Sequence, residues 1–117
     1  MTTTKRTFCL YLIKPSHYDD DGYVIQWWKS PIPSNSLAAV YGLTQDCIAR
    51  QVLGPDVEFD VEAMDETNTE VHVDTIAARI EAADVGMVML IGVQSNQFPR
   101  ALDIARPLRE RGIQVGI

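Results

Sequence analysis

The sequence predicts an α/β protein built on a parallel sheet with helices on its faces. Strand-like and helix-like segments alternate along the chain, from a β-prone run at 7–13 to another at 113–117, and such alternation is typical of parallel strands joined by helices. The runs 7–13 and 85–91 are almost continuously apolar, which indicates central strands covered on both faces. A chain of 117 residues is long enough for one domain with its own hydrophobic core.

The first strand ends at Lys14-Pro15, because proline cannot donate to a strand ladder. A long connection follows, from Lys14 to Ser36, whereas connections in such folds usually have about two to six residues. We expect it to carry a small element of its own and to fold over the domain or meet a neighbouring domain. Its acidic run Asp19-Asp20-Asp21-Gly22 is interpreted as a solvated turn, and Trp27-Trp28 are expected to pack this loop rather than stack on a planar ligand.

The first helix is predicted between Ser34-Asn35-Ser36, which supply N-cap side chains, and Gly54-Pro55, which ends a helix. Apolar residues recur at helical spacing from Leu37 to Val52. The segment 57–63 then alternates apolar and acidic residues, as a half-exposed strand at the edge of a sheet does.

The second half of the chain continues the same order of elements. After the polar loop 64–73, Asp74 or Thr75 is expected to cap a short helix that runs to about Ala82. The run 85–91 is then the second buried strand.

A third helix is expected after the turn 92–96. Its apolar residues share one face: Phe98, Ala101, Leu102, Ile104, Ala105 and Leu108. Pro107 lies inside this helix, where it removes a backbone hydrogen bond and is expected to produce a kink. The last strand is expected at 113–117.

These elements predict a flavodoxin-like (Rossmann-like) three-layer fold that is truncated after the fourth strand. In the flavodoxin-like order the first strand lies between the second and the third. Ligands of such folds bind at the carboxyl ends of the strands, beside the switch point between the first and third strands. Three segments are expected to meet there: Lys14 to Ser36, Met64 to Val73 and Gly92 to Phe98.

The turn 92–96 is the best candidate for a ligand site. Gly92 permits close approach of the backbone to a ligand, and Gln94, Ser95 and Asn96 offer neutral hydrogen-bond donors and acceptors. Such a turn suits a neutral, hydrogen-bonding ligand. Capping of the third helix by Ser95 or Asn96 is an alternative role that is compatible with ligand binding.

The composition argues against several classes of function. The net charge of −6 disfavours nucleic-acid and anionic-membrane binding, because phosphate binding needs clustered Lys and Arg. Arg100, Arg106, Arg109 and Arg111 lie on a helix interrupted by acids and are interpreted as a solvated face. No signal peptide and no apolar run long enough to span a bilayer is recognised, so we expect a cytoplasmic location.

No catalytic or metal site can be assigned from these residues. Cys9 and Cys47 lack a partner at metal or redox spacing and are interpreted as buried thiols, and His17 and His72 are also unpaired. The connection after the first strand lacks the G-x-G-x-x-G and P-loop patterns. A receiver domain is disfavoured because the third strand ends in Gly92 without a carboxylate.

Three segments carry a family resemblance: Ile13-Lys14-Pro15 at the end of the first strand, the Pro-rich turn and Leu-Ala-Ala helix at Pro31 to Val40, and Ile91 to Ser95 followed by Arg100 to Ala105. Together they resemble the cobalamin-binding-type domain that precedes the catalytic barrel in many radical S-adenosylmethionine (radical SAM) enzymes. The last strand is similar to the family strand that continues into a Gly-Gly turn. The resemblance implies that 1–117 is the N-terminal module of a longer protein.

The resemblance also implies a set of corrinoid contacts. By position they fall on the turn after the third strand, at Gly92, Gln94, Ser95 and Asn96. The family motif D-x-H-x-x-G, whose His ligates cobalt, is not met, because Pro15 stands two residues before His17 and Gly22 five residues after it. The catalytic C-x-x-x-C-x-x-C motif is absent from 1–117, so S-adenosylmethionine and a 4Fe-4S cluster are implied only for a downstream domain.

The chain is therefore interpreted as a cobalamin-binding module of a radical SAM enzyme, without catalytic residues or protein metal ligands of its own. Its partners would be a corrinoid and the downstream domain of the same chain. The alternatives are a structural or interaction domain that kept the fold and lost the corrinoid, and a stand-alone flavin- or nucleotide-binding module. The apolar strand 113–117, as an unpaired edge, also predicts self-association.

Overall fold

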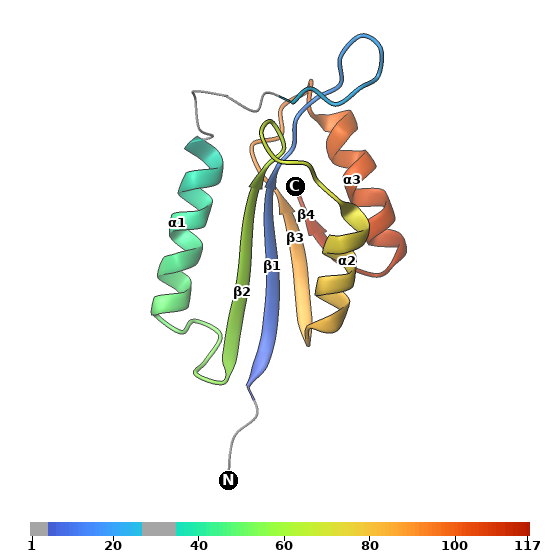
Figure 1. Cartoon of the computed structure of the whole chain (residues 1–117). Coiled ribbons are helices and arrows are strands. Elements are labelled where there is room, and N and C mark those ends of the chain that lie inside the picture. Colours follow the sequence, from blue (N-terminus) through green and yellow to red (C-terminus); the bar gives the residue numbers. More distant parts are fainter. Residues whose placement is uncertain (1–4, 27–34) are drawn as a thin grey trace.

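The computed structural model describes residues 5–26 and 35–117 (Figure 1). Strands and helices alternate in the order β1 (Arg6–Lys14), α1 (Asn35–Ala49), β2 (Val57–Asp65), α2 (Val73–Ala82), β3 (Val85–Leu90), α3 (Phe98–Glu110) and β4 (Gln114–Gly116). This order confirms the predicted α/β class. Trp27-Trp28 and the expected cap residue Ser34 lie outside the described residues. Within the described part of the chain, no helix has both the length and the apolar character that a bilayer span requires.

All four strands run parallel, in the order β2-β1-β3-β4. β2 forms one edge, as its alternating pattern predicted, and the switch point lies between β1 and β3. The register pairs Lys14 with Asp65 on one side of β1, and Ile13 with Leu90 on the other. The carboxyl ends of these three strands therefore meet at one edge of the sheet, which confirms the flavodoxin-like order.

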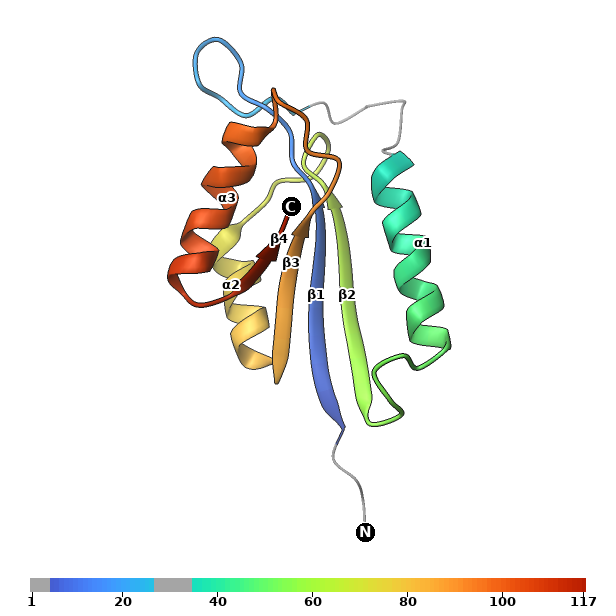
Figure 2. The same cartoon turned by 180° about the vertical axis from the view of Figure 1, so that it is seen from behind.

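Helices cover both faces of the sheet: α1 lies on one face, and α2 and α3 lie on the other (Figure 1, Figure 2). The side chains of β1 alternate between the two faces, as the pleat of a strand requires. Cys9, Tyr11 and Ile13 join the core under α2 and α3, whereas Leu10 and Leu12 join the core under α1. All five are at most 6% exposed, so β1 is buried on both faces, as predicted.

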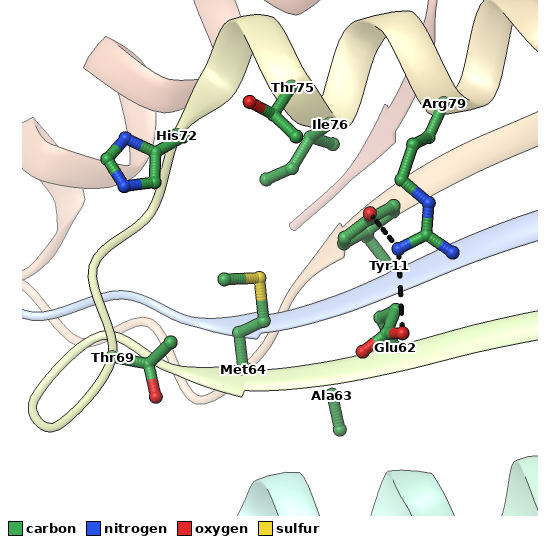
Figure 3. Close-up of a pocket in the computed structure, with 9 residues that line it drawn as sticks. All are labelled: Tyr11, Glu62, Ala63, Met64, Thr69, His72, Thr75, Ile76 and Arg79. Atoms are coloured by element: carbon green, nitrogen blue, oxygen red, sulfur yellow. Dashed lines mark hydrogen bonds and ion pairs between the residues drawn. The ribbon is translucent and has the colours of Figure 1, made fainter.

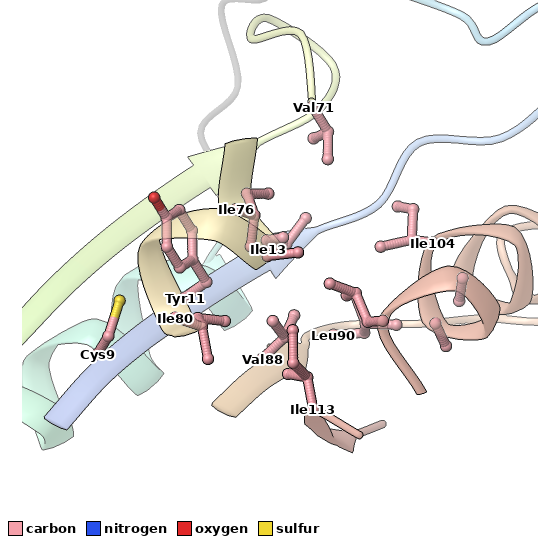
Figure 4. Packing of buried hydrophobic residues seen from close by; sticks show 14 residues of the cluster. Cys9, Tyr11, Ile13, Val71, Ile76, Ile80, Val88, Leu90, Ile104 and Ile113 are labelled. Atoms are coloured by element: carbon pink, nitrogen blue, oxygen red, sulfur yellow. The ribbon is translucent and has the colours of Figure 1, made fainter. Parts of the chain in front are cut away.

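The larger core lies between the sheet and the pair α2 and α3 (Figure 4). It joins Val88 and Leu90 of β3 to apolar side chains of the two helices: Ile76, Ala77, Ile80, Ala101, Ile104, Ala105 and Leu108. Gly86 allows this close packing, because a Cβ there would lie 2.7 Å from Cγ2 of Ile80. The predicted apolar face of α3 is thus confirmed for its central residues, while Phe98 at its start is 47% exposed.

α1 is covered far less than the other two helices. Its single buried residue is Thr44, whose hydroxyl donates to the Val40 carbonyl oxygen at 2.8 Å. Leu43 is 66% exposed. An apolar cavity of about 410 Å³ lies between the helix and the sheet, with Leu10 and Met89 in its wall. The α1 face of the sheet is therefore an open apolar surface.

The helix ends differ from the positions that local signals predict. α2 begins at Val73 after the N-cap residue His72, which makes no side-chain cap bond, so the expected cap by Asp74 or Thr75 is wrong. Asp74 lies one residue inside the first turn, where its charge still favours the positive end of the helix. α1 ends at Ala49 rather than near Val52. α3 continues through Pro107 to Glu110, and its kink stays a prediction.

Candidate functional site

The carboxyl ends of β1, β2 and β3 bring three connections together at one edge of the sheet (Figure 1). Glu66 N–H donates to the Lys14 carbonyl oxygen at 3.0 Å, and Ile91 N–H donates to the Ile13 carbonyl oxygen at 2.8 Å. The connection after β1, the β2–α2 loop and the β3–α3 turn therefore lie side by side, as the fold class predicted. This region is called the carboxyl edge below.

Lys14 spans the switch point between β1 and β3. Its Nζ donates to the Gly92 carbonyl oxygen at 3.2 Å, and burial lowers the pKa of Lys14 because the ammonium loses contact with water. Gly92 has a φ of +66°, and a Cβ there would lie 3.1 Å from Cδ of Lys14 and 3.4 Å from Cβ of Ser36. The space beside Gly92 is thus occupied by this chain's own side chains, and the role of Gly92 as a ligand contact stays a prediction.

The neutral side chains after β3 face solvent. Gln94, Ser95 and Asn96 are exposed, and none of their side chains makes a hydrogen bond within the described residues. The expected cap by Ser95 or Asn96 is wrong, because the N-cap residue of α3 is Gln97, without a side-chain cap bond. Its Oε1 instead accepts from Gln94 N–H at 2.9 Å and closes the turn. Ser95 and Asn96 therefore play no part in capping α3, and their role as ligand contacts stays a prediction.

A cavity of about 350 Å³ lies next to this turn, since Gln97 forms part of its wall. The remaining lining residues come from the other two connections: Ser16, His17, Ile25 and Thr67. Among the described residues, the lining combines apolar surface with imidazole, hydroxyl and amide groups and contains no carboxylate. Such a lining suits a neutral ligand with a few hydrogen-bonding groups.

The described part of the connection after β1 forms a small hairpin, residues 16–25. Tyr18 and Val24 make an antiparallel bridge, and the Asp19 carboxylate accepts two backbone N–H groups of the turn at 2.9 Å each. The acidic run 19–21 forms the exposed tip of the hairpin, as the sequence predicted. The long connection therefore contains an ordered element of its own.

A buried ion pair lies at the base of the hairpin. Glu66, directly after β2, is 1% exposed, and Arg100 of α3 donates to it from Nε at 3.0 and 3.1 Å and from Nη2 at 2.7 Å. Ser16 N–H donates to the same carboxylate at 3.1 Å. Such partners are needed because a buried carboxylate loses the hydrogen bonds of water. The hydrogen bonds to Glu66 raise the pKa of Arg100 above its ordinary value.

Arg100 extends this network to the outer part of the hairpin. Its Nη1 donates to the Tyr18 hydroxyl at 3.3 Å, and its guanidinium carbon lies 5.8 Å from the centre of the Tyr18 ring. The Tyr18 hydroxyl donates to Oδ2 of Asp103 on α3. Burial, together with this bond to Asp103, raises the pKa of Tyr18. Side chains thus join the hairpin, the β2–α2 loop and α3 into one unit.

Sequence patterns missed this network. The interpretation of the basic residues of α3 as a solvated face is wrong for Arg100, whose side chain is 18% exposed, although it holds for Arg106 at 71%. Arg100 differs because the first turn of α3 faces the loops of the carboxyl edge. Glu66 follows an acidic strand and precedes a polar loop, so no local signal separates it from exposed carboxylates. The unusual length of the connection after β1 is the one sequence signal that this connection could pack on the domain and bury residues such as Glu66 and Arg100.

A second groove, of about 260 Å³, lies between β2 and α2 (Figure 3). In its wall, Nη1 of Arg79 donates to the buried Tyr11 hydroxyl at 2.7 Å. The same guanidinium pairs with Asp60 at 2.9 Å and with Glu62 at 3.5 Å. Because two carboxylates neutralise Arg79, this groove lacks the free charge that would attract an anionic ligand. It is a weaker candidate site than the carboxyl edge.

Potential metal ligands are scattered. Among residues 5–26 and 35–117, no group of three His, Cys, Asp or Glu side chains could hold a metal ion. Cys9 is buried, as predicted, and burial raises the pKa of its thiol. Cys47 is only partly buried on α1. His17 stands alone in the wall of the carboxyl-edge cavity.

Comparisons with known proteins add no further guide. No family model matches the chain, and neither a curated protein nor a solved structure matches it. A functional assignment therefore depends on the geometry of the carboxyl edge and on the residues that carry the family resemblance.

Proposed function

We propose that this chain is a corrinoid-binding module of a radical SAM enzyme, that it acts in the cytoplasm, and that it carries no catalytic residue of its own. The proposal is carried by one observation: the exposed, neutral turn at Gln94, Ser95 and Asn96 lies at the switch point of a flavodoxin-like sheet. Ligands of such sheets bind at this point. The resemblance of the sequence to the cobalamin-binding-type domains of radical SAM enzymes supports the same assignment.

The donor groups of the turn fit a corrinoid. A corrinoid ring carries neutral carboxamide side chains around its rim, and the amides of Gln94 and Asn96 and the hydroxyl of Ser95 can donate to such groups and accept from them. Gly92 would contribute its backbone to the same contacts. When bound, the corrinoid would supply cobalt chemistry to a downstream domain that holds S-adenosylmethionine and a 4Fe-4S cluster. No metal ligand is required from His17.

One observation favours a second candidate, an interaction domain without a corrinoid. The α1 face of the sheet is open and apolar, with Leu43 66% exposed beside a cavity of about 410 Å³. Exposed apolar surface of this kind marks contact with another protein or domain. In this alternative, the radical SAM domain would cover the α1 face, and the carboxyl edge would bind no ligand.

Titration with hydroxocobalamin, followed through its visible absorption, tests the first proposal. We expect a weak spectral change with the wild-type chain, because the Gly-Gly turn of the family would follow Ile117. Ser95→Tyr should abolish the change, since a bulky ring on the turn blocks close approach of the ligand. His17→Ala should leave the visible spectrum of the bound corrinoid unchanged, because the proposal assigns no cobalt ligand to His17.

The control is Asp56→Tyr, which places the same aromatic ring on an exposed position just before β2. This position lies at the amino ends of the strands, away from the carboxyl edge. It should bind hydroxocobalamin like the wild type. If neither this chain nor a protein extended beyond Ile117 changes the spectrum, the corrinoid proposal is wrong and the interaction domain replaces it.

A further inference from the structure

We infer that Glu66 and Arg100 are positioning residues of the proposed site, because they fix the hairpin 16–25 as one wall of the carboxyl-edge cavity. The identity of the ligand in this inference rests on the proposed function. The fixing of the hairpin rests only on the geometry of the buried pair, so the two can be tested separately.

Both ends of the hairpin are attached at Glu66. At its start, Ser16 N–H donates to the Glu66 carboxylate at 3.1 Å, and the Ser16 hydroxyl donates across the hairpin to the Ile25 carbonyl oxygen at 2.6 Å. Just after its end, Nε2 of Gln26 donates to the Glu66 carbonyl oxygen at 3.4 Å. The base of the hairpin is therefore closed around a single residue of the β2–α2 loop.

Arg100 attaches the outer part of the hairpin to α3. Its Nε and Nη2 hold Glu66 while its Nη1 donates to the Tyr18 hydroxyl. A planar guanidinium can hold two partners in this way, whereas the single ammonium of a lysine cannot match its geometry. The Tyr18 hydroxyl then reaches Asp103, one turn further along α3. The hairpin is thus fixed at its base and along one side.

The walls of the cavity come from both sides of this attachment: Ser16, His17, Ile25, Thr67 and Gln97. The first three belong to the hairpin. Thr67 directly follows Glu66, and Gln97 directly precedes α3. A movement of the hairpin would therefore carry Ser16, His17 and Ile25 away from Thr67 and Gln97 and open the cavity.

The pair fixes the hairpin without adding charge to the cavity. Glu66 is 1% exposed and Arg100 is 18% exposed, and neither lines the cavity. Their opposite charges cancel each other beneath its wall. The described lining therefore holds no carboxylate, ammonium or guanidinium group, which suits the neutral carboxamide rim of a corrinoid.

Amide hydrogen exchange across 16–25, measured with hydroxocobalamin titration of the same proteins, tests this inference. The double variant Glu66→Leu/Arg100→Met replaces the buried pair with apolar side chains, a change that often preserves or raises stability. We expect its thermal midpoint to stay near that of the wild type. The hairpin amides should exchange at least about tenfold faster, because opening of the hairpin no longer breaks contacts with Glu66 and Arg100. For the same reason, hydroxocobalamin should bind about tenfold more weakly.

Arg50→Met is the matched control, because it removes a 64% exposed arginine directly after α1, on the other face of the sheet from α3. It should change neither hairpin exchange nor binding. If the double variant fails to fold, Arg100→Lys answers the same question, since it keeps the charge but cannot hold Glu66 and Tyr18 together. It should quicken hairpin exchange while the thermal midpoint falls only slightly.

Each outcome decides between the two claims. Hairpin exchange at the wild-type rate in the double variant overturns the inference, whether or not the chain binds a corrinoid. Faster exchange with unchanged hydroxocobalamin affinity also overturns it, because the hairpin would then not shape the site. Faster exchange in a chain whose wild type binds no hydroxocobalamin supports the fixing of the hairpin and rejects the corrinoid.

Discussion

Lys14 and Gly92 meet across the switch point of the sheet. The Lys14 ammonium donates to the Gly92 carbonyl oxygen at 3.2 Å, and Cδ of the lysine would lie 3.1 Å from a Cβ at position 92. The lysine therefore ties the end of β1 to the turn that follows β3. Gly92 is required by this contact and by its φ of +66°, whether or not a ligand binds.

Gly92→Ala is expected to lower the free energy of unfolding by about 1–3 kcal/mol, because the new Cβ is strained at positive φ and crowds Lys14. Gly42→Ala is the matched control, since Gly42 lies within α1 and a Cβ there meets nothing within 4 Å. That change should be neutral or stabilise by up to about 1 kcal/mol. Urea denaturation measures both, and equal effects of the two substitutions would contradict the contact.

Gly86→Ala is expected to destabilise the protein more than Gly92→Ala. A Cβ at position 86 would lie 2.7 Å from Cγ2 of the buried Ile80 and 2.8 Å from the carbonyl oxygen of Cys9, a backbone atom of the central strand. Overpacking of a core typically costs about 1–3 kcal/mol and sometimes more. If the thermal midpoint of Gly86→Ala lies within about two degrees of the wild-type value, β3 and α2 are less closely packed at Gly86 than the structure indicates.

Ionisation of the buried Tyr11 hydroxyl is expected to lower the stability of the protein at alkaline pH. Burial raises the pKa of Tyr11 above its ordinary value of 10.0, so the folded state keeps this proton where the unfolded chain has lost it. The contribution is complete below about pH 10 and is lost as the pH rises through the folded-state pKa. Burial of the Cys9 thiol acts in the same direction.

Tyr11→Phe tests the sign of this effect. It should cost about 1 kcal/mol at neutral pH, because the hydrogen bond from Arg79 is lost. It should also flatten the decline of stability at alkaline pH. Urea unfolding at neutral and alkaline pH measures both effects. If the free energy of unfolding of Tyr11→Phe falls as steeply at alkaline pH as that of the wild type, groups other than Tyr11 cause the decline.

The open α1 face strengthens the expectation of self-association. Leu43 is 66% exposed and Leu53 is 52% exposed, and exposed apolar surface of this kind tends to be buried against another surface. Sedimentation velocity should show larger species that grow with protein concentration. Leu43→Gln should reduce them and Arg106→Gln should not. A single monomer peak at every concentration would contradict this prediction and the one drawn from the last strand.

The fold could be predicted because the pattern of apolar and polar residues within each segment reflects how that segment is buried. The apolar run around Leu12 marks a strand covered on both faces, and the alternation around Asp60 marks an edge. The attachment of the hairpin has no such local pattern, because Glu66 and Arg100 are 34 residues apart in the sequence and come into contact only when the chain folds. The cap expected at Ser95 failed because the side chain of Gln97 closes that turn instead.

The location of hydroxocobalamin on the chain tests the central claim most directly. Amide chemical shifts of a ¹⁵N-labelled protein, recorded during the titration, report which segments meet the ligand. The account predicts shifts in the turn 92–96 and at the base of the hairpin, with the amides of α1 unchanged. Shifts confined to the cavity beneath α1 or to the groove at Arg79, or no shifts as the ligand is raised to millimolar concentration, would contradict it.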